Sequence, residues 1–438
     1  MNRSVFFHQA LEIAVEKIKN QLPALKNEVV LIRNILGQIR VLLSGSEKDY
    51  DKSVLSAINT EMRDELGVYA SPGQFIYMFT SEAKAVEDYF KHEDRYCIFN
   101  ENIGRIWILE RQIIGQDWTR KPIERKTKNR RVTFYGVKGG VGRSTALVLW
   151  AWHLAKNGKK VLIVDLDLES PGISRTLLPA SDDLLPDFGI VDWFIEDALD
   201  QKQGDEILEN MTAQSPISQG VSGEIRVSPC FGRKTGAYMP KLSRCYMDSS
   251  GTGIKPWGDR LNRLVESLET KIQPDVVLLD SRAGLHDIAA LTITRMDADV
   301  FLFAVDAPQT WSAYAYLFQQ WKNYSHLGKV REKIQIIAGM VPETNREVHL
   351  KHFIQQSWEL FSTHLYDEIS PGQVGLFNFD PEDTEAPHYP LPIFWHRGLQ
   401  EFDPCNSTSG LDEQLLSASM GIFIKEAETM IFPEENRI

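Results

Sequence analysis

A glycine-rich segment that follows an apolar strand and opens a helix constrains this chain more than any other feature. It reads Tyr135-Gly-Val-Lys-Gly-Gly-Val-Gly-Arg-Ser-Thr145 and begins at the end of the apolar run 132–135. Its glycines allow a tight turn whose backbone N–H groups point inward. The helix that follows would direct its free N–H groups and the positive end of its dipole at the same anion. The segment therefore predicts a phosphate-binding loop, with Ser144 placed to bind Mg²⁺ and Thr145 beside it.

The chain from residue 132 onward alternates short apolar runs with longer helical stretches. Several runs are continuously hydrophobic, which is typical of strands buried on both faces. We therefore expect an α/β fold with a mostly parallel sheet covered by helices on both faces, and a ligand at the carboxyl ends of the strands. The expected strands are 132–135, 161–164, 225–228, 276–279, 300–305 and 334–338, and the expected helices include 258–271 and 309–321.

Four segments of this region resemble the ParA/MinD ATPases, in the same order. Lys138-Gly-Gly-Val-Gly-Arg-Ser144 resembles the family's phosphate loop, KGGVGK[ST]. The segment 161–172 with its Asp-Leu-Asp resembles the first switch, 276–284 resembles the Walker B strand and second switch, and 301–308 resembles the next strand. The resemblance spans about residues 130–340, and the arginine in the loop is similar to a variant branch, the KGGVGR-motif ATPases. It implies a P-loop fold with ATP and Mg²⁺ as cofactors.

The resemblance also assigns roles within the loop. Lys138 matches the signature lysine, which in the family reaches across a dimer interface to the partner's phosphates. A homodimer that forms on nucleotide binding is therefore implied. The residues expected to hold the nucleotide are Gly139, Gly140, Val141, Gly142, Arg143, Ser144 and Thr145.

The acidic strand ends take the remaining roles that the resemblance implies. Asp167 matches the switch aspartate that positions the attacking water. Ser144 would hold Mg²⁺ directly, Asp280 would hold it through water, and Asp165 would support the metal shell. Phosphoryl transfer would then depend on positioning and charge neutralisation.

Arg143 is a departure from the family, in which a lysine at this position contacts the β and γ phosphates. Arginine keeps the charge and can bridge two oxygens, but it is planar and bulkier. We expect nucleotide binding to persist and hydrolysis to be slow. The chain would be an ATPase whose catalytic residues are Lys138, Arg143 and Asp167.

Two further residues have roles that the sequence leaves open. Arg282, in the second switch, is interpreted either as a phosphate sensor or charge stabiliser, or as an ion-pair partner of a nearby acid such as Asp287. Asn345 follows the last expected strand, where relatives place an asparagine that recognises adenine.

Residues 1–118 lie outside the resemblance and predict a small α+β domain. Apolar spacing favours helix over 1–44 and a polar helix near 81–91, and strands are expected at 74–79, 96–99 and 105–109. This domain has no catalytic spacing, so we expect it to sense a signal or bind a protein partner.

A basic segment, 119–131, separates this domain from the ATPase domain expected at 132–438. It holds seven basic residues and one acid, and is interpreted as a solvated linker or as a phosphate-contacting segment for nucleic acid. An insertion is expected around 181–255, where the basic stretch 231–244 is either a lid or partner loop or a plain surface insertion. The net charge of −12 argues against nucleic-acid binding over the whole surface.

The remaining signals predict a cytoplasmic protein. The chain has no run of 18 uncharged apolar residues and no signal-peptide pattern at its start, and its four cysteines lie far apart. The apolar stretch 411–432 carries mostly acidic charges, which anionic membranes would repel, so a packed terminal helix without membrane insertion is expected.

Three functional hypotheses follow. The first is a Mg-ATP-driven switch that dimerises around nucleotide and acts on a protein or nucleic-acid partner. The second is a nucleotide-binding scaffold with little turnover, motivated by Arg143. The third is a DNA-binding ATPase that uses the basic segment 119–131.

Overall fold

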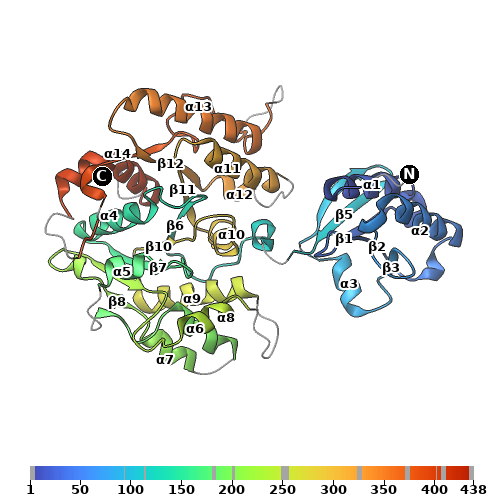
Figure 1. The fold of residues 1–438 in the computed structure, drawn as a ribbon, viewed down its shortest axis with the longest axis horizontal. Helices are drawn as coiled ribbons and strands as arrows, with labels where there is room; N and C mark the ends of the chain where they lie inside the picture. The colour runs from blue at the N-terminus through green and yellow to red at the C-terminus, as the bar shows by residue number, and fades with distance from the viewer. Residues whose placement is uncertain are drawn as a thin grey trace. The chain divides into compact units, whose positions relative to one another are not determined.

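The computed structural model describes two compact units. The described residues up to Arg120 form the first unit, and those from Lys121 form the second (Figure 1). The residues described are 5–92, 94–112, 115–179, 184–199, 203–247, 256–322, 328–369, 375–400, 402–405 and 411–433. Parts of the expected insertion, at 181–183, 200–202 and 248–255, therefore lie outside the described residues.

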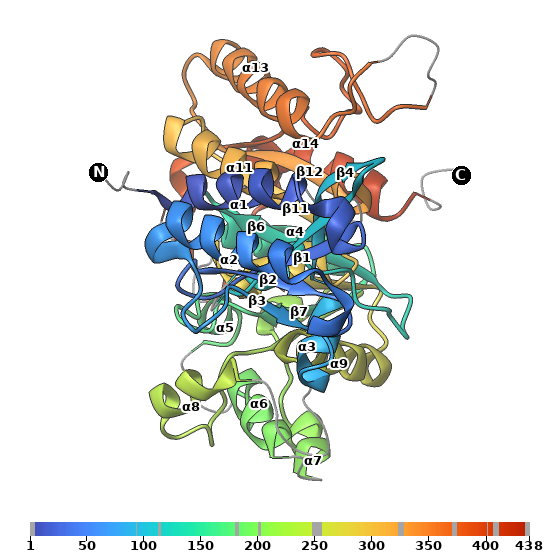
Figure 2. The same cartoon turned by 90° about the vertical axis from the view of Figure 1, so that its right-hand side faces the viewer.

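The first unit is a five-stranded sheet, in the order β3-β2-β1-β5-β4, with helices on both faces. Helices α1 and α2 lie side by side on one face (Figure 2), and α3 packs on the other. Strand β1 pairs antiparallel with β2 and parallel with β5. The elements are α1 (Phe7–Lys19), β1 (Glu28–Arg33), β2 (Ile39–Leu43), α2 (Lys52–Leu66), β3 (Tyr77–Phe79), α3 (Lys84–Phe90), β4 (Tyr96–Glu101) and β5 (Gly104–Glu110).

The expectation of helix throughout 1–44 is wrong after Lys19. Strands β1 and β2 form a hairpin instead, because the run Val29–Ile32 is apolar at every position and mostly β-branched, which suits a strand buried on both faces. The Asn34 side chain accepts hydrogen bonds from the N–H groups of Leu36 and Gln38, and Gly37 takes a left-handed φ of 83°. This turn connects β1 and β2 within the segment that the apolar spacing predicted as helix.

The second unit contains an eight-stranded sheet in the order β13-β12-β11-β6-β10-β7-β9-β8. Every pair is parallel except β8 with β9, so the predicted α/β class is confirmed. The strands are β6 (Arg130–Gly136), β7 (Lys160–Asp165), β8 (Ala213–Gln214), β9 (Glu224–Ser228), β10 (Val276–Asp280), β11 (Asp299–Ala304), β12 (Ile334–Val341) and β13 (Leu391–Phe394).

Helices cover both faces of this sheet, as expected. Helices α4 and α14 share one hydrophobic core, and α6, α9 and α10 share the core of the opposite face (Figure 1). The helices are α4 (Arg143–Lys156), α5 (Ile173–Leu177), α6 (Ile190–Ala198), α7 (Gln203–Glu209), α8 (Tyr238–Cys245), α9 (Trp257–Ile272), α10 (Asp287–Thr294), α11 (Pro308–Trp321), α12 (Gly328–Arg331), α13 (Arg346–His364) and α14 (Glu413–Ile431).

The terminal helix α14 packs against β13 and α4, which is the packed arrangement expected for 411–432. Its apolar residues Met420, Phe423 and Ala427 are buried in the sheet core. Among the described residues, no helix is both long enough and apolar enough to cross a membrane.

Most arginines of the basic segment 119–131 are engaged within their own unit. The fully buried Arg131 guanidinium donates two hydrogen bonds to Glu269, of 2.7 and 2.8 Å. Arg125 contacts Asp297, and the Arg130 guanidinium lies 5.0 Å from the centre of the Phe432 ring. Arg120 pairs with Asp94, while the side chains of three lysines remain exposed: Lys121, Lys126 and Lys128. The arginines therefore contribute mainly to packing, and the three lysines are the most exposed basic side chains of the segment.

Candidate functional site

The glycine-rich loop lies at the carboxyl end of β6, between the central strands β10 and β11. Gly140 and Gly142 adopt left-handed φ angles of 72° and 82°, which favour glycine over other residues. Gly142 caps α4, which begins at Arg143. Gly139 and Gly140 are exposed, and a Cβ atom added at either would meet no heavy atom within 4 Å, so this side of the loop is open. This is the geometry of an anion cradle at a helix N-terminus.

The loop also passes close to β12 of the same sheet, at a glycine that the sequence analysis missed. Gly339 lies in β12, and a Cβ atom there would approach the Val141 carbonyl oxygen to 2.3 Å. Only a residue without a side chain lets the loop pass this closely. The signal was a glycine inside an otherwise apolar strand, which marks close backbone approach.

Two acidic strand ends lie beside the loop. Asp165 ends β7 and Asp280 ends β10, and the two residues are register partners in the parallel sheet. The Ser144 hydroxyl donates a 3.5 Å hydrogen bond to Asp280 Oδ2, and Arg143 Nε lies 3.0 Å from Asp280 Oδ1. Arg143 Nη2 also donates to Asp167 Oδ2 at 3.4 Å. The structure thus brings together five residues that sequence alone placed in three separate segments.

The electrostatics of this cluster favour an added cation. Burial raises the pKa of Asp280 to about 7, against the opposing effect of Arg143, and burial also raises the pKa of Asp167. Burial alone would lower the pKa of Arg143, but Asp280 and Asp167 outweigh it and raise that pKa. Asp280 and Asp167 therefore share the Arg143 guanidinium, and a further positive charge would stabilise their ionised forms.

The residues present fit a magnesium ion and a phosphate chain. Asp280 Oδ1 is buried and, among the described residues, has no hydrogen-bond partner of good geometry. This oxygen forms an ion pair with Arg143. A buried carboxylate oxygen of this kind, next to a serine hydroxyl, is the kind of oxygen donor set that Mg²⁺ shares with substrate phosphates. The open glycine loop beside it would supply N–H donors to those phosphates.

Asp165 takes a different part from its two neighbours. It is fully buried, and its Oδ2 accepts hydrogen bonds from the Ser174 N–H at 2.8 Å and the Ser174 hydroxyl at 2.5 Å. Its Oδ1 accepts a 3.3 Å bond from the Asp167 N–H. In this arrangement Asp165 braces the turn that leads into α5, and its support of a metal shell stays a prediction.

Lys138 is exposed at the tip of the loop and, within the described part of the chain, forms no ion pair. Val141 is buried beneath the loop, while Thr145 is half-buried and faces a cavity of about 270 Å³. This cavity is lined by Gly140, Gly142, Thr145, Ala146, Met340, Ile393, Phe394, Trp395, His396, Leu399, Gln400 and Met420. It adjoins the loop, and its aromatic side chains offer flat surfaces to a base.

Sequence analysis missed this aromatic side of the site. Trp395 and His396 follow β13 and lie some 250 residues beyond the loop in the chain. Asn345, the residue expected to recognise adenine, does not line the cavity; it is the exposed N-terminal cap of α13, with a φ of 55°. A role of Asn345 in recognising adenine therefore stays a prediction, and the residues at the β13 end are further candidates for contacts to a base.

Arg282 pairs with Glu169 and so joins the segment 276–284 to the segment 161–172. Its Nη1 lies 2.5 Å from Glu169 Oε1, which also accepts a 2.6 Å hydrogen bond from the Tyr246 hydroxyl. Tyr238 of α8 donates a 2.5 Å bond to the Leu168 carbonyl. The basic stretch 231–244 thus contacts the segment 161–172, and the ion-pair interpretation of Arg282 is supported by its pair with Glu169.

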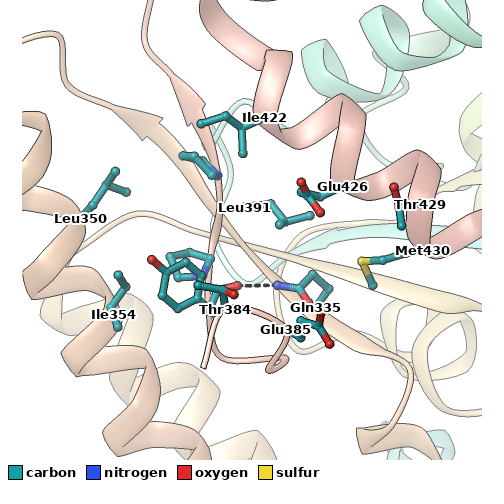
Figure 3. Close-up of a pocket in the computed structure, with 13 residues that line it drawn as sticks. Gln335, Leu350, Ile354, Thr384, Glu385, Leu391, Ile422, Glu426, Thr429 and Met430 are labelled. Carbon is teal, nitrogen blue, oxygen red and sulfur yellow. Dashed lines mark hydrogen bonds between the residues drawn. The ribbon is translucent and has the colours of Figure 1, made fainter. Parts of the chain in front are cut away.

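A second, larger cavity of about 630 Å³ lies away from the loop (Figure 3). Leu350 and Ile354 of α13 face Ile422 and Met430 of α14 across it, and the segment before β13 forms its floor. Glu426 also lines it. It contains no residue of the glycine loop, so we place no part of the nucleotide there.

A comparison with protein-family models gives a match that spans the glycine loop. The AAA domain family model matches residues 129–188, which contain the glycine loop, Asp165 and Asp167. A search of curated proteins returns no significant match.

Similar solved structures include a pNOB8 ParA bound to nonspecific DNA, with 15% identity, a TM-score of 0.43, and coverage of 71% of this chain and 100% of that one. The cell division ATPase MinD of Pyrococcus furiosus shows 17% identity and a TM-score of 0.41, with coverage of 69% and 100%. MinD of Pyrococcus horikoshii, complexed with Mg-ADP, shows 16% and 0.41, with coverage of 70% and 98%. We argue function from the residues of this chain.

Proposed function

We propose that this chain is a Mg²⁺-dependent ATPase that dimerises around nucleotide, in the manner of the ParA/MinD ATPases. The observation that carries the proposal is the meeting of Ser144, Arg143 and the buried Asp280 at the mouth of an open glycine loop. A helix N-terminus, a hydroxyl and a carboxylate in this arrangement suit a metal–triphosphate complex better than any other common ligand.

Each residue would have a defined task. The N–H groups of the loop would bind phosphate oxygens, and Arg143 would neutralise charge on the transferred group. Ser144 and Asp280 would hold Mg²⁺, which supplies charge neutralisation across the phosphates when bound. Asp167 would orient the attacking water, for which it must leave the Arg143 guanidinium that it contacts in the structure.

Lys138 supports the dimer half of the proposal. It stands exposed at the loop tip, clear of the carboxylate cluster that its neighbour Arg143 contacts. A lysine in this position can reach a phosphate held by a second copy of the chain. Among the described residues, no aspartate or glutamate forms an ion pair with Lys138.

The test measures phosphate release and sedimentation with ATP and with ADP. We expect slow hydrolysis and an ATP-dependent dimer for the native chain. Lys138→Ala should bind nucleotide but remain monomeric, while Lys128→Ala, which removes another exposed lysine, should behave as the native chain does. ATP binding without dimerisation in every variant would sink the switch proposal.

A scaffold with little turnover is the second candidate, and the Arg143–Asp167 contact favours it. A guanidinium that holds Asp167 withdraws it from water activation. Replacing Arg143 with lysine separates the two candidates. A sharp rise in hydrolysis would favour the scaffold, because arginine would then be suppressing turnover. Loss of existing turnover would show that Arg143 takes part in catalysis.

A further inference from the structure

The Arg143 side chain bridges two carboxylates rather than pointing into the open loop. Its Nε lies 3.0 Å from Asp280 Oδ1 and its Nη2 lies 3.4 Å from Asp167 Oδ2. The Arg143 side chain is 10% exposed, that of Asp280 1% and that of Asp167 14%. The guanidinium is therefore a buried counter-ion whose planar fork meets two acids at once.

The same carboxylate is the one that a magnesium ion would need. Asp280 presents Oδ1 to Arg143 and Oδ2 to the Ser144 hydroxyl, so both faces of the group are engaged. A divalent cation between Ser144 and Asp280 would lie beside the guanidinium in a buried, weakly screened site, where like charges repel strongly. Mg²⁺ and the present position of Arg143 thus compete for Asp280.

Nucleotide phosphates offer Arg143 an alternative partner. Arginine forms strong bidentate hydrogen bonds to phosphate, and the loop that starts its helix is the cradle described above. Movement of the guanidinium to a phosphate would free Asp280 and Asp167 together. The metal could then bind to Asp280, Ser144 and the phosphates.

We propose that Arg143 sets the order of binding: it keeps divalent cations off Asp280 until nucleotide phosphates draw its guanidinium away. This inference rests on the proposed function, because it takes nucleotide to bind at the glycine loop. Arg143 is here a positioning residue for the metal, in addition to any contact with phosphate. A lysine has one ammonium and no fork, so it would hold the two carboxylates less effectively.

Mn²⁺ is the probe for this proposal, because free Mn²⁺ is counted directly by electron paramagnetic resonance. The full chain is titrated without nucleotide, as the native protein and as Arg143→Ala, Arg143→Gln and Arg143→Lys. We expect the Ala and Gln variants to bind Mn²⁺ about tenfold or more tightly than the native chain, with Lys between them. Two neutral variants are used so that the titration still gives a result if one of them does not fold.

Arg282→Ala is the matched control, since Arg282 also pairs with an acid but contacts Glu169 instead of Asp280. It should bind Mn²⁺ as weakly as the native chain. Adding Asp280→Asn to Arg143→Gln should remove the new site. Equal Mn²⁺ affinity in the native chain and the neutral variants, or a new site that survives Asp280→Asn, would overturn the proposal.

Nucleotide binding is measured separately, with fluorescent ATP in the presence of EDTA. The native chain should bind it without metal, because nucleotide comes first. No binding with or without Mg²⁺ would reject the proposed function, while the Mn²⁺ titrations would still report on Arg143. Binding only when Mg²⁺ is present would overturn the proposed order.

Discussion

The role of a charged side chain in this molecule depends on how deeply it is buried and on which partner it contacts there. Arg143 and Arg131 are both arginines within a dozen residues of each other, yet one contacts the acids of the site and the other locks the sheet to α9. The sequence does not distinguish these two roles, because they depend on which acidic residue each arginine contacts in the folded chain.

His388 gives a prediction of pH dependence at the residue scale. It is fully buried, its Nε2 lies 3.2 Å from the Pro381 carbonyl and its Nδ1 lies 2.5 Å from the Tyr366 hydroxyl. A carbonyl only accepts, so Nε2 carries a proton, and in the neutral ring Nδ1 accepts a hydrogen bond from the Tyr366 hydroxyl.

Burial lowers the pKa of His388, against a smaller opposing effect of the Pro381 carbonyl. The unfolded chain therefore takes up this proton first as the pH falls, so the stability that His388 contributes is full above about pH 6.5 and is lost below it. Urea unfolding between pH 7.5 and 5 should show a steeper loss of stability for the native chain than for His388→Gln. Equal slopes would contradict this assignment.

At the scale of elements, the contact between β12 and the glycine loop leaves no room for a side chain at Gly339. Gly339→Ala places a methyl group against the Val141 carbonyl and should destabilise the second unit by about 1–3 kcal/mol. It should also weaken ATP binding, because the loop must shift. Gly421→Ala is the control: its added methyl meets Ser417 Oγ at an ordinary 3.6 Å inside α14, so it should stabilise by up to about 1 kcal/mol.

Arg131 tests whether the basic segment belongs to the packed second unit. Arg131→Met leaves Glu269 buried without its main partner and should cost about 3–5 kcal/mol of unfolding free energy. Arg131→Met/Glu269→Met should recover most of that loss, whereas the exposed Lys128→Met should change stability by less than about 0.5 kcal/mol. A small effect of Arg131→Met would indicate a solvated linker.

The same segment limits the nucleic-acid hypothesis. Lys121, Lys126 and Lys128 are the exposed basic side chains of this segment, so neutralising these three lysines should strongly weaken any salt-dependent DNA binding that the segment provides. A gel-shift titration at two salt concentrations measures it. Unchanged DNA binding by the triple variant would assign the contact to another surface.

The elements that sequence predicted well are those with a strong local signal. Strands β6, β7 and β10 were evident from continuous apolar runs, and the loop from its glycines. The hairpin β1–β2 was missed because its apolar positions also fit a helical period. The aromatic cavity and Gly339 were missed because their role depends on tertiary contacts with the loop, which no local pattern contains.

At the scale of the whole molecule, the two units have separate cores and separate sheets. The site is built entirely from residues of the second unit. We therefore expect the sensing or partner function proposed for the first unit to be separable from nucleotide binding, which concerns the second unit alone.

The melting temperature of the full chain with Mg-ATP tests the central claim most directly. A ligand at about 100 times its dissociation constant stabilises the folded state by about 2.7 kcal/mol, which corresponds to several degrees. We predict such a shift with Mg-ATP for the native chain and for Arg282→Ala, and loss of most of it in Arg143→Ala. No shift with either Mg-ATP or Mg-ADP, or an undiminished shift in Arg143→Ala, would contradict a nucleotide site at the glycine loop.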